Sequence, residues 1–152
     1  MQLRFWQSAL MGALDVLTSC VVKDPNERKA IWPTVQARMQ TKRGEYKKAE
    51  ASYNEALALL AKNNDLKTEY FKGCLMEDLA KLYMEQNRYQ ESESKFDAAL
   101  LCYNKSPLAK TPSHQKSKAE CLAYYAILLR AMQQPERASQ MEAQARELRA
   151  LT

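Results

Sequence analysis

Apolar and small side chains recur at intervals of three and four residues along most of the chain, with polar and charged side chains between them. This spacing places the apolar residues on one face of an α-helix. Runs of β-branched residues, which would favour strands, do not occur. The pattern therefore predicts an all-α protein with seven helices, at about residues 2–22, 25–43, 46–62, 66–86, 89–104, 113–132 and 135–151.

Two of these helices carry distinctive end signals. Asp24, Pro25 and Glu27 provide the cap, first-turn proline and acidic residue of a helix start. Pro33 lies eight residues after Pro25, so we expect it to kink this helix or to mark its true start. The last helix, 135–151, has one narrow apolar stripe, which is typical of a terminal capping helix whose outer side meets water.

A repeat connects the central helices. Segments 44–57 and 87–100 share the order turn residue, tyrosine, small residue, aromatic residue and small residue, with an offset of 43 residues. A weaker third copy follows 46 residues later, with Pro135 in place of the tyrosine and Glu142 in place of the aromatic residue. The small residues shared by the copies are Ala37, Ala80 and Ala126, then Ala49, Ser92 and Ala138, then Ala56, Ala99 and Ala145.

Close helix packing explains why these positions are small. Antiparallel helices joined by a tight turn bring their backbones together only where the side chains between them are short. Larger aromatic residues, Tyr53 and Phe96 among them, then fill the remaining volume. Gly44 and Asn87 tolerate the left-handed conformation that ends a helix, so we expect both at turns.

The repeat resembles the tetratricopeptide repeat family over residues 30–151. Its spacing exceeds the usual length of about 34 residues and is similar to the long repeats of kinesin light chains, whose Pro/His-containing connection resembles segment 111–114. The resemblance implies a right-handed α–α superhelix of about three helix pairs plus an N-terminal helix. We expect one domain, 1–152, divided into an N-terminal helix at 1–26 and repeats at 27–64, 65–110 and 111–152, the last with a C-terminal capping helix.

In this family the first helix of each pair lines a concave surface that holds a partner protein or peptide. When the equivalent positions are assigned in this chain by their place in the repeat, that surface is basic at one end, mixed in charge in the middle and partly apolar at the other end. In a competing interpretation, some of these residues pack against the N-terminal helix instead. Thr34, Arg38, Ala123 and Ile127 occupy the places of a carboxylate clamp, so the clamp of some members is absent. The candidate binding residues are Arg38, Lys42, Glu77, Asp78, Lys81, Glu85, Tyr124, Ile127 and Arg130.

The residues that would carry catalysis or bind a cofactor are missing from the sequence pattern. The three glycines stand apart, so there is no phosphate-binding loop, and the four cysteines form no paired metal-ligand motif. The single histidine, His114, falls in a polar connection without fixed neighbours. We expect no enzyme activity, no cofactor and no metal, and we expect the cysteines to be reduced and mostly buried.

The net charge of +5 allows an acidic partner without requiring nucleic acid. Residues 105–118 contain four lysines and no acidic residue, which indicates either a solvated loop or a landing site for an acidic partner. Nucleic acid is not expected, because the equivalent positions differ in kind between repeats. The acidic residues of helix 66–86 favour a solvated face over acid–base chemistry: Glu77, Asp78 and Glu85.

The N-terminal segment allows two interpretations. Its spacing favours an amphipathic helix, packed on the first repeat, in a cytoplasmic protein; the alternative is an exported lipoprotein lipidated at Cys20. Apolar runs are too short for a membrane span. The leading functional hypothesis is a protein-binding module. The alternative is a structural subunit, or a homodimer, that docks through this helix, around which Phe5, Trp6 and Met11 are spread.

Overall fold

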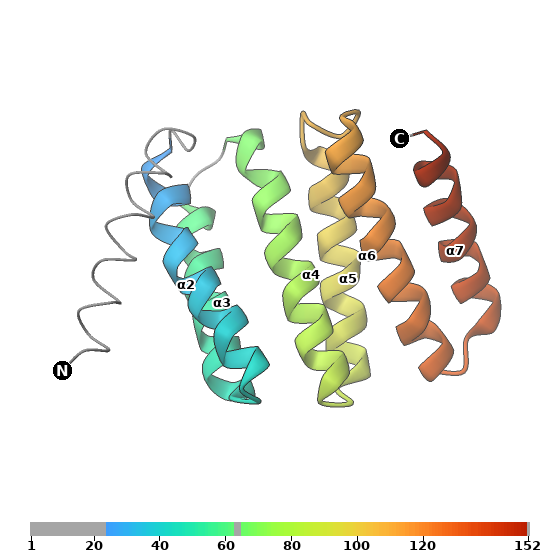
Figure 1. The fold of residues 1–152 in the computed structure, drawn as a ribbon, viewed down its shortest axis with the longest axis horizontal. Helices are drawn as coiled ribbons and strands as arrows, with labels where there is room; N and C mark the ends of the chain where they lie inside the picture. The colour runs from blue at the N-terminus through green and yellow to red at the C-terminus, as the bar shows by residue number, and fades with distance from the viewer. Residues whose placement is uncertain (1–23, 63–64, 152) are drawn as a thin grey trace.

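The computed structural model describes residues 24–62 and 65–151, except the side chain of Lys67, and these residues form an all-α stack without strands (Figure 1). This confirms the predicted all-α, tetratricopeptide-like fold. The helix expected at 2–22 lies outside the described residues. The helices are α2 (Pro25–Lys42), α3 (Tyr46–Ala61), α4 (Glu69–Glu85), α5 (Tyr89–Lys105), α6 (Pro112–Ala131) and α7 (Pro135–Ala150), with a 3₁₀ turn, η1 (Leu66–Thr68), before α4.

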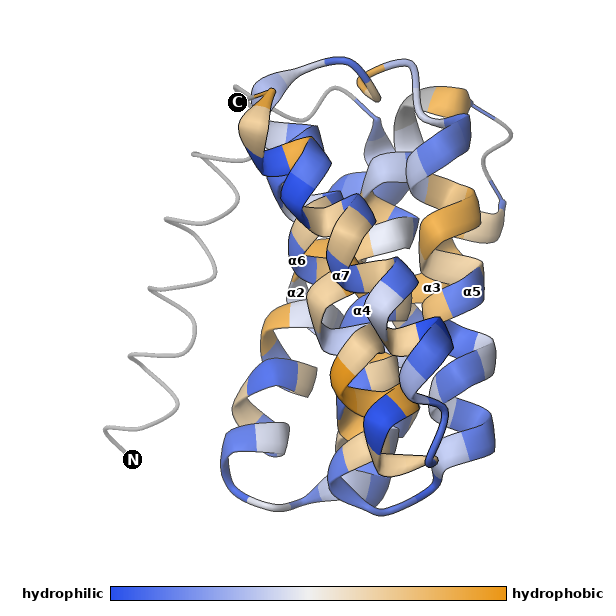
Figure 2. Ribbon diagram, turned by 90° about the vertical axis from the view of Figure 1, so that its right-hand side faces the viewer, coloured by the Kyte–Doolittle hydropathy of each residue, from blue (hydrophilic) through white to orange (hydrophobic). Residues whose placement is uncertain are grey.

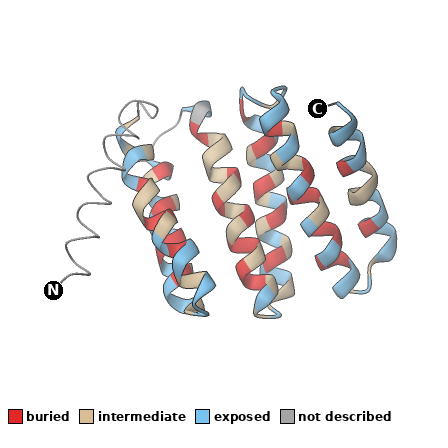
Figure 3. Ribbon diagram, viewed as in Figure 1, coloured by how far each residue is buried: buried red, intermediate tan, exposed pale blue. Residues whose placement is uncertain are grey.

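The helices pack in consecutive pairs, α2 with α3, α4 with α5, and α6 with α7. Helices α3 and α4, and α5 and α6, join one pair to the next, and α4 also contacts α6. Viewed along the stack in Figure 2, hydrophobic positions lie mostly on the inner sides of the helices. Figure 3 shows buried positions where helices face one another, while α7 at the end of the stack is largely exposed. The capping role of α7 stays a prediction.

The turns inside the three pairs share one backbone conformation. Gly44, Asn87 and Gln133 have φ of 73°, 59° and 59°, and they are spaced by the 43 and 46 residues of the sequence repeat. The amide of the following residue donates to the carbonyl five residues earlier at 2.8–2.9 Å in each turn. This bond satisfies a carbonyl that the helix end would leave unpaired. The turns at Gly44 and Asn87 were predicted, whereas Gln133 was not.

Helix α2 begins where the sequence signals placed it. The Asp24 carboxylate accepts hydrogen bonds from the amides of Asn26 and Glu27, at 2.8 and 2.9 Å. These bonds satisfy two amides that have no partner inside the helix. The helix then continues through Pro33, which is buried, to Lys42. The alternative start at Pro33 is therefore wrong, because the cap at Asp24 fixes the helix start a full two turns earlier.

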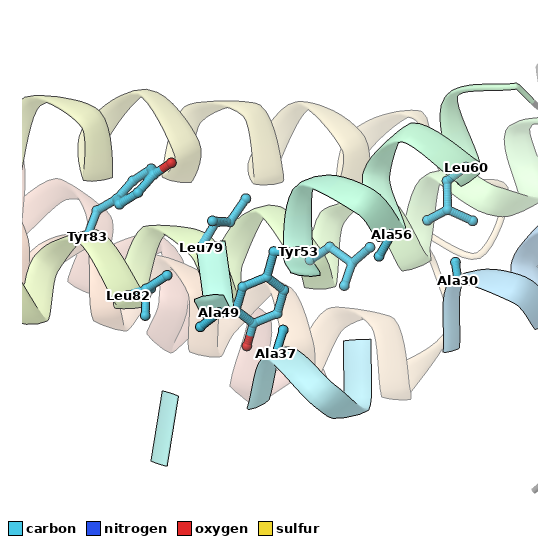
Figure 4. Close-up of a cluster of buried hydrophobic side chains, with 10 residues drawn as sticks. Ala30, Ala37, Ala49, Tyr53, Ala56, Leu60, Leu79, Leu82 and Tyr83 are labelled. Atoms are coloured by element: carbon cyan, nitrogen blue, oxygen red, sulfur yellow. The ribbon is translucent and has the colours of Figure 1, made fainter. Parts of the chain in front are cut away.

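The small residues of the repeat lie between the helices. All nine of the predicted positions are at most 2% exposed. Figure 4 shows this packing in the first pair, where Ala37 and Ala49 lie near the ring of Tyr53. The one serine in the set, Ser92, donates from Oγ to the carbonyl of Ala80 at 2.7 Å, so its hydroxyl is satisfied inside the stack. Small side chains therefore set the helix spacing in every pair.

Between α4 and α5 the interior contains polar groups that the sequence analysis placed outside. Glu77 is only 6% exposed, because its Oε2 accepts a 2.8 Å hydrogen bond from the hydroxyl of buried Tyr103. The expected solvated face is therefore wrong for Glu77. The Tyr103 ring lies against Gly73, where an added Cβ would come within 2.9 Å of the ring carbons. Glycine at this position permits the close approach of the two helices.

His114 is also buried, in contrast to the expected polar connection without fixed neighbours. It lies in the first turn of α6, is 1% exposed, and its Nε2 is 2.8 Å from the carbonyl oxygen of Tyr103. The rings of Tyr70 and Tyr103 lie 5.0 and 5.3 Å from the imidazole, centroid to centroid. Burial lowers the pKa of His114. The histidine therefore helps to pack α6 onto the second pair.

The described cysteines are free thiols. Cys121 is buried, while Cys74 and Cys102 are half-buried, so the expected burial holds fully for one of these three. Burial raises the pKa of each thiol, that of Cys102 to about 11. The thiolate is the reactive form of cysteine, so these thiols are poor nucleophiles at neutral pH. Cys20 lies outside the described residues.

Candidate functional site

The predicted binding residues occupy one face of the first helices α2, α4 and α6, which we call the first-helix face. All nine belong to these helices, but they differ in exposure. Glu77 is buried, and Asp78 and Lys81 are half-buried. The structure therefore removes Glu77 from direct contact with a partner. The remaining six are exposed: Arg38, Lys42, Glu85, Tyr124, Ile127 and Arg130.

Two contacts connect the three first helices. Arg38 Nε of α2 donates to Asp78 Oδ2 of α4 at 2.8 Å. Lys81 Nζ of α4 lies 3.9 Å from the centroid of the Tyr124 ring of α6. Lys81 follows Arg38 by 43 residues and Tyr124 follows Asp78 by 46, which are the repeat offsets. The two contacts are thus equivalent: a cation of one pair reaches the same position of the next pair.

Ile127 occupies the third copy of the cation position, 46 residues after Lys81. It is 55% exposed, and Tyr124, one helical turn before it, is 40% exposed. Residues three apart on a helix are surface neighbours. Tyr124 and Ile127 therefore form an apolar spot on α6, and we keep this name for the two residues.

Two cations beside the apolar spot are already paired within the chain. The guanidinium of Arg130 donates two hydrogen bonds to the Glu142 carboxylate, both at 3.0 Å. Lys81 Nζ donates to Glu77 Oε1 at 2.6 Å. Burial opposes the charge on Lys81, but its hydrogen bond to Glu77 and the nearby charges of Glu77 and Asp78 together outweigh that effect, and the pKa of Lys81 is raised. Lys81 is thus a fixed cation, held between a buried carboxylate and an exposed ring.

The other side of the stack has an arrangement that the sequence analysis missed. Glu50 of α3 accepts hydrogen bonds from the Tyr83 hydroxyl and from Arg88 Nη1, both at 2.8 Å. The hydrogen bond from Arg88 lowers the pKa of Glu50. Glu93, 43 residues later, accepts from Arg137 Nη1 at 2.7 Å. The available signal was a glutamate directly after Ala49 and directly after Ser92, the small residues near the start of the second helices of the first two pairs. These glutamates join successive pairs.

The lysine-rich segment 105–118 is more structured than a solvated loop. Helix α5 ends at Lys105 and α6 begins at Pro112, so only 106–111 connects them. Lys118 Nζ donates to Asn104 Oδ1 at 2.7 Å. The remaining lysines are exposed: Lys105, Lys110 and Lys116. Binding of an acidic partner by this segment stays a prediction.

Other features of the described residues add little evidence for a binding or catalytic site. A crevice of about 390 Å³ is lined by Tyr83 and by residues 90, 91, 94 and 95, none of which belongs to the predicted site. Within residues 24–62 and 65–151, His, Cys, Asp and Glu side chains form no group suited to a metal ion. In the same residues no helix is both long and apolar enough to cross a membrane.

The comparison with known families agrees with this geometry. A family model described as Tetratricopeptide repeat matches residues 34–67, which include most of α2 and all of α3. None of the curated proteins compared with the chain matches it. The family match shows similarity to tetratricopeptide repeats over residues 34–67, and the other two helix pairs share its turn conformation and its small buried residues.

Proposed function

We propose that this protein is a binding module, and that its first-helix face holds a segment of a partner protein. Tetratricopeptide repeats generally mediate interactions between proteins, and residues 34–67 match that family. The observation that carries the proposal is the apolar spot, where Tyr124 and Ile127 remain 40% and 55% exposed. A tyrosine and an aliphatic residue together offer a contact area that a partner side chain can bury.

The paired charges beside the spot support its use as an anchor. Binding removes water from the contacted surface, and an unpaired charge loses hydration when that happens. Arg130 and Lys81 already have carboxylate partners, in Glu142 and Glu77. A partner can therefore cover the spot without leaving either of these two cations uncompensated. We expect the partner to place an apolar side chain on Tyr124 and Ile127.

We further propose that the chain belongs to the long-repeat type similar to kinesin light chains, with repeats at 27–64, 65–110 and 111–152. The positive φ values at Gly44, Asn87 and Gln133 support this division, since they mark turns 43 and 46 residues apart. A solvent face of three first helices is long enough for an extended peptide segment.

Selection of peptides from a random dodecamer phage library gives a probe for this proposal. The selected peptide is labelled, and its affinity is measured by fluorescence anisotropy for the wild type and for a variant carrying Lys81→Glu and Tyr124→Ala. We expect several-fold weaker binding with unchanged helical content. Leu101→Ser is the matched control for Ile127→Ser, because both side chains are 55% exposed but Leu101 lies on α5. Equal losses for these two single variants would contradict the proposal.

The alternative, a structural subunit or homodimer, depends on the segment 2–22 and on Phe5, Trp6 and Met11, which lie outside the described residues. Light scattering at low protein concentration separates the two functions, because a stable dimer favours the alternative. If Phe5→Ala with Trp6→Ala abolishes peptide binding while the changes at Lys81 and Tyr124 do not, the N-terminal segment is the docking surface.

A further inference from the structure

The turn between α2 and α3 carries more exposed positive charge than the other two helix-pair turns. Lys42, Arg43, Lys47 and Lys48 are all exposed around Gly44. Lys48 pairs with Glu45 at 2.8 Å. Within residues 24–62 and 65–151, the other three form no ion pair. We call Lys42, Arg43 and Lys47 the basic corner.

The equivalent turns of the other pairs are compensated. Arg88, in the turn between α4 and α5, pairs with Glu50 at 2.8 Å and with Glu91. Arg137, in the first turn of α7, pairs with Glu93 at 2.7 Å. The three turns have the same backbone conformation, so the backbone does not account for this difference in charge. Three cations close together repel one another, and an ion pair would relieve that repulsion. Glu45 is the carboxylate of this turn; its pKa is lowered mainly by its partner Lys48 and also by the charge of Arg43. One carboxylate faces four cations there, so an external acidic group would supply the further ion pairs.

We infer that the basic corner binds an acidic segment of a protein partner, one that presents several Asp or Glu side chains in a row. The corner lies on the first helix pair and shares Lys42 with the first-helix face, whereas the apolar spot lies on α6 in the third pair. The inference therefore does not depend on the anchor proposed at Tyr124 and Ile127. Exposed cations attract an acidic chain over a distance of about 10 Å at 0.1 M salt. Such contacts raise the association rate and select the partner by charge.

The surroundings of the corner favour a peptide over nucleic acid or a membrane. Two cations of the surrounding elements, Arg38 and Arg88, are already paired with carboxylates. The basic corner itself covers only one turn, and a polynucleotide needs a longer track of cations together with aromatic rings for stacking. Residues 42–48 contain no exposed large apolar side chain to enter a lipid surface. A short acidic segment fits this small area best.

A fluorescein-labelled octaglutamate peptide tests the inference with the full chain. The corner variant carries Lys42→Glu, Arg43→Glu and Lys47→Glu. The matched control carries Lys105→Glu, Lys110→Glu and Lys116→Glu, which changes the net charge equally in the other basic segment. We expect the corner variant to bind octaglutamate about tenfold more weakly at low salt, and the control to lose no more than about twofold. Circular dichroism melts check that both variants fold.

Three outcomes would overturn the inference. Equal losses in the two variants would mean that net charge alone attracts the peptide. A loss in the control only would assign the site to residues 105–118. Binding of single-stranded oligothymidylate, or of phosphatidylserine vesicles, that is tighter than octaglutamate binding and lost in the corner variant would assign another class of partner. We expect Ile127→Ser to leave octaglutamate binding unchanged, so a failure of this inference can be distinguished from a failure of the proposed function.

Discussion

The packed interior and the first-helix face follow the repeat in different ways. The three equivalent interior positions are all alanine and at most 1% exposed: Ala37, Ala80 and Ala126. The very next residues, on the surface, are Arg38, Lys81 and Ile127. Helix packing admits only a small side chain at the first set of positions, and it leaves the second set free. The interior positions, which are the same in each repeat, therefore specify the fold. The surface positions differ between repeats, and these differences carry the information about partners.

The substitution Ala80→Leu is the strongest test of the packed interior. We expect it to lower the free energy of unfolding by about 1–3 kcal/mol, because a larger side chain has no space between α4 and α5. Urea titration measures the change. Ala58→Leu on the exposed side of α3 is the control and should have almost no effect. Equal effects of the two changes would remove Ala80 from the helix interface.

Gly73→Ala tests the close approach of Tyr103. Alanine favours a helix by about 1 kcal/mol over glycine, so an unconstrained site would gain stability. The added Cβ would lie 2.9 Å from two carbons of the buried Tyr103 ring, and we expect overpacking to give a net loss of about 1 kcal/mol. In a Tyr103→Leu background the same change should become neutral or stabilising. A gain in stability in the wild type would show that the ring moves aside freely.

The stability of the interior should also depend on pH through His114. Burial lowers its pKa in the folded state, and the unfolded value is about 6.5. The neutral form is thus favoured in the fold, so its contribution is present above about pH 6.5 and is lost as pH falls through the folded-state pKa. The groups that face it are Tyr70, Tyr103 and Lys118.

Thermal melts between pH 7.5 and pH 5 measure this dependence. His114 is the single histidine of the chain, so a His114→Gln variant should show a flatter profile over this range than the wild type. Identical slopes for the two proteins would contradict the role given to His114.

Substitutions on the first-helix face should have the smallest effects on stability. Arg38→Met removes the ion pair with Asp78, in which the two side chains are 55% and 21% exposed. We expect a loss of at most about 1 kcal/mol, which added salt reduces. Melts at low and high salt measure it. A loss as large as that of Ala80→Leu would mean that this surface ion pair holds the helix pairs together as strongly as the packed interior does.

Sequence alone predicted the features that depend on neighbours along the chain. The turns at Gly44 and Asn87 and the Asp24 cap follow from local chemistry, and the repeat spacing fixed the buried small residues. Gln133 was missed because glutamine is not typical of a left-handed turn, although the repeat register pointed to it. The positions of Glu77 and His114 depend on Tyr103, a residue of another helix, and helical periodicity carries no information about such a partner.

The candidate site was predicted in outline only. Register placed all nine residues on the first helices, but it did not show which charges are compensated. Lys81 is held by Glu77 and Tyr124, whereas Lys42 forms no ion pair within the described residues. That distinction depends on distances between helices. It explains why the sequence suggested a mostly charged groove with one partly apolar end, while the structure leads us to propose an anchor at that apolar end, on α6.

The central claim, that the first-helix face binds a partner segment, is tested most directly by NMR titration of the isotopically labelled protein with the phage-selected peptide. We predict that the largest amide shifts lie on α6 around Tyr124 and Ile127 and on α4 around Lys81, with Leu101 on α5 unaffected. Shifts confined to α5 and α7, or to residues 2–22, would contradict the claim, because the peptide would then occupy a surface that the first helices do not form.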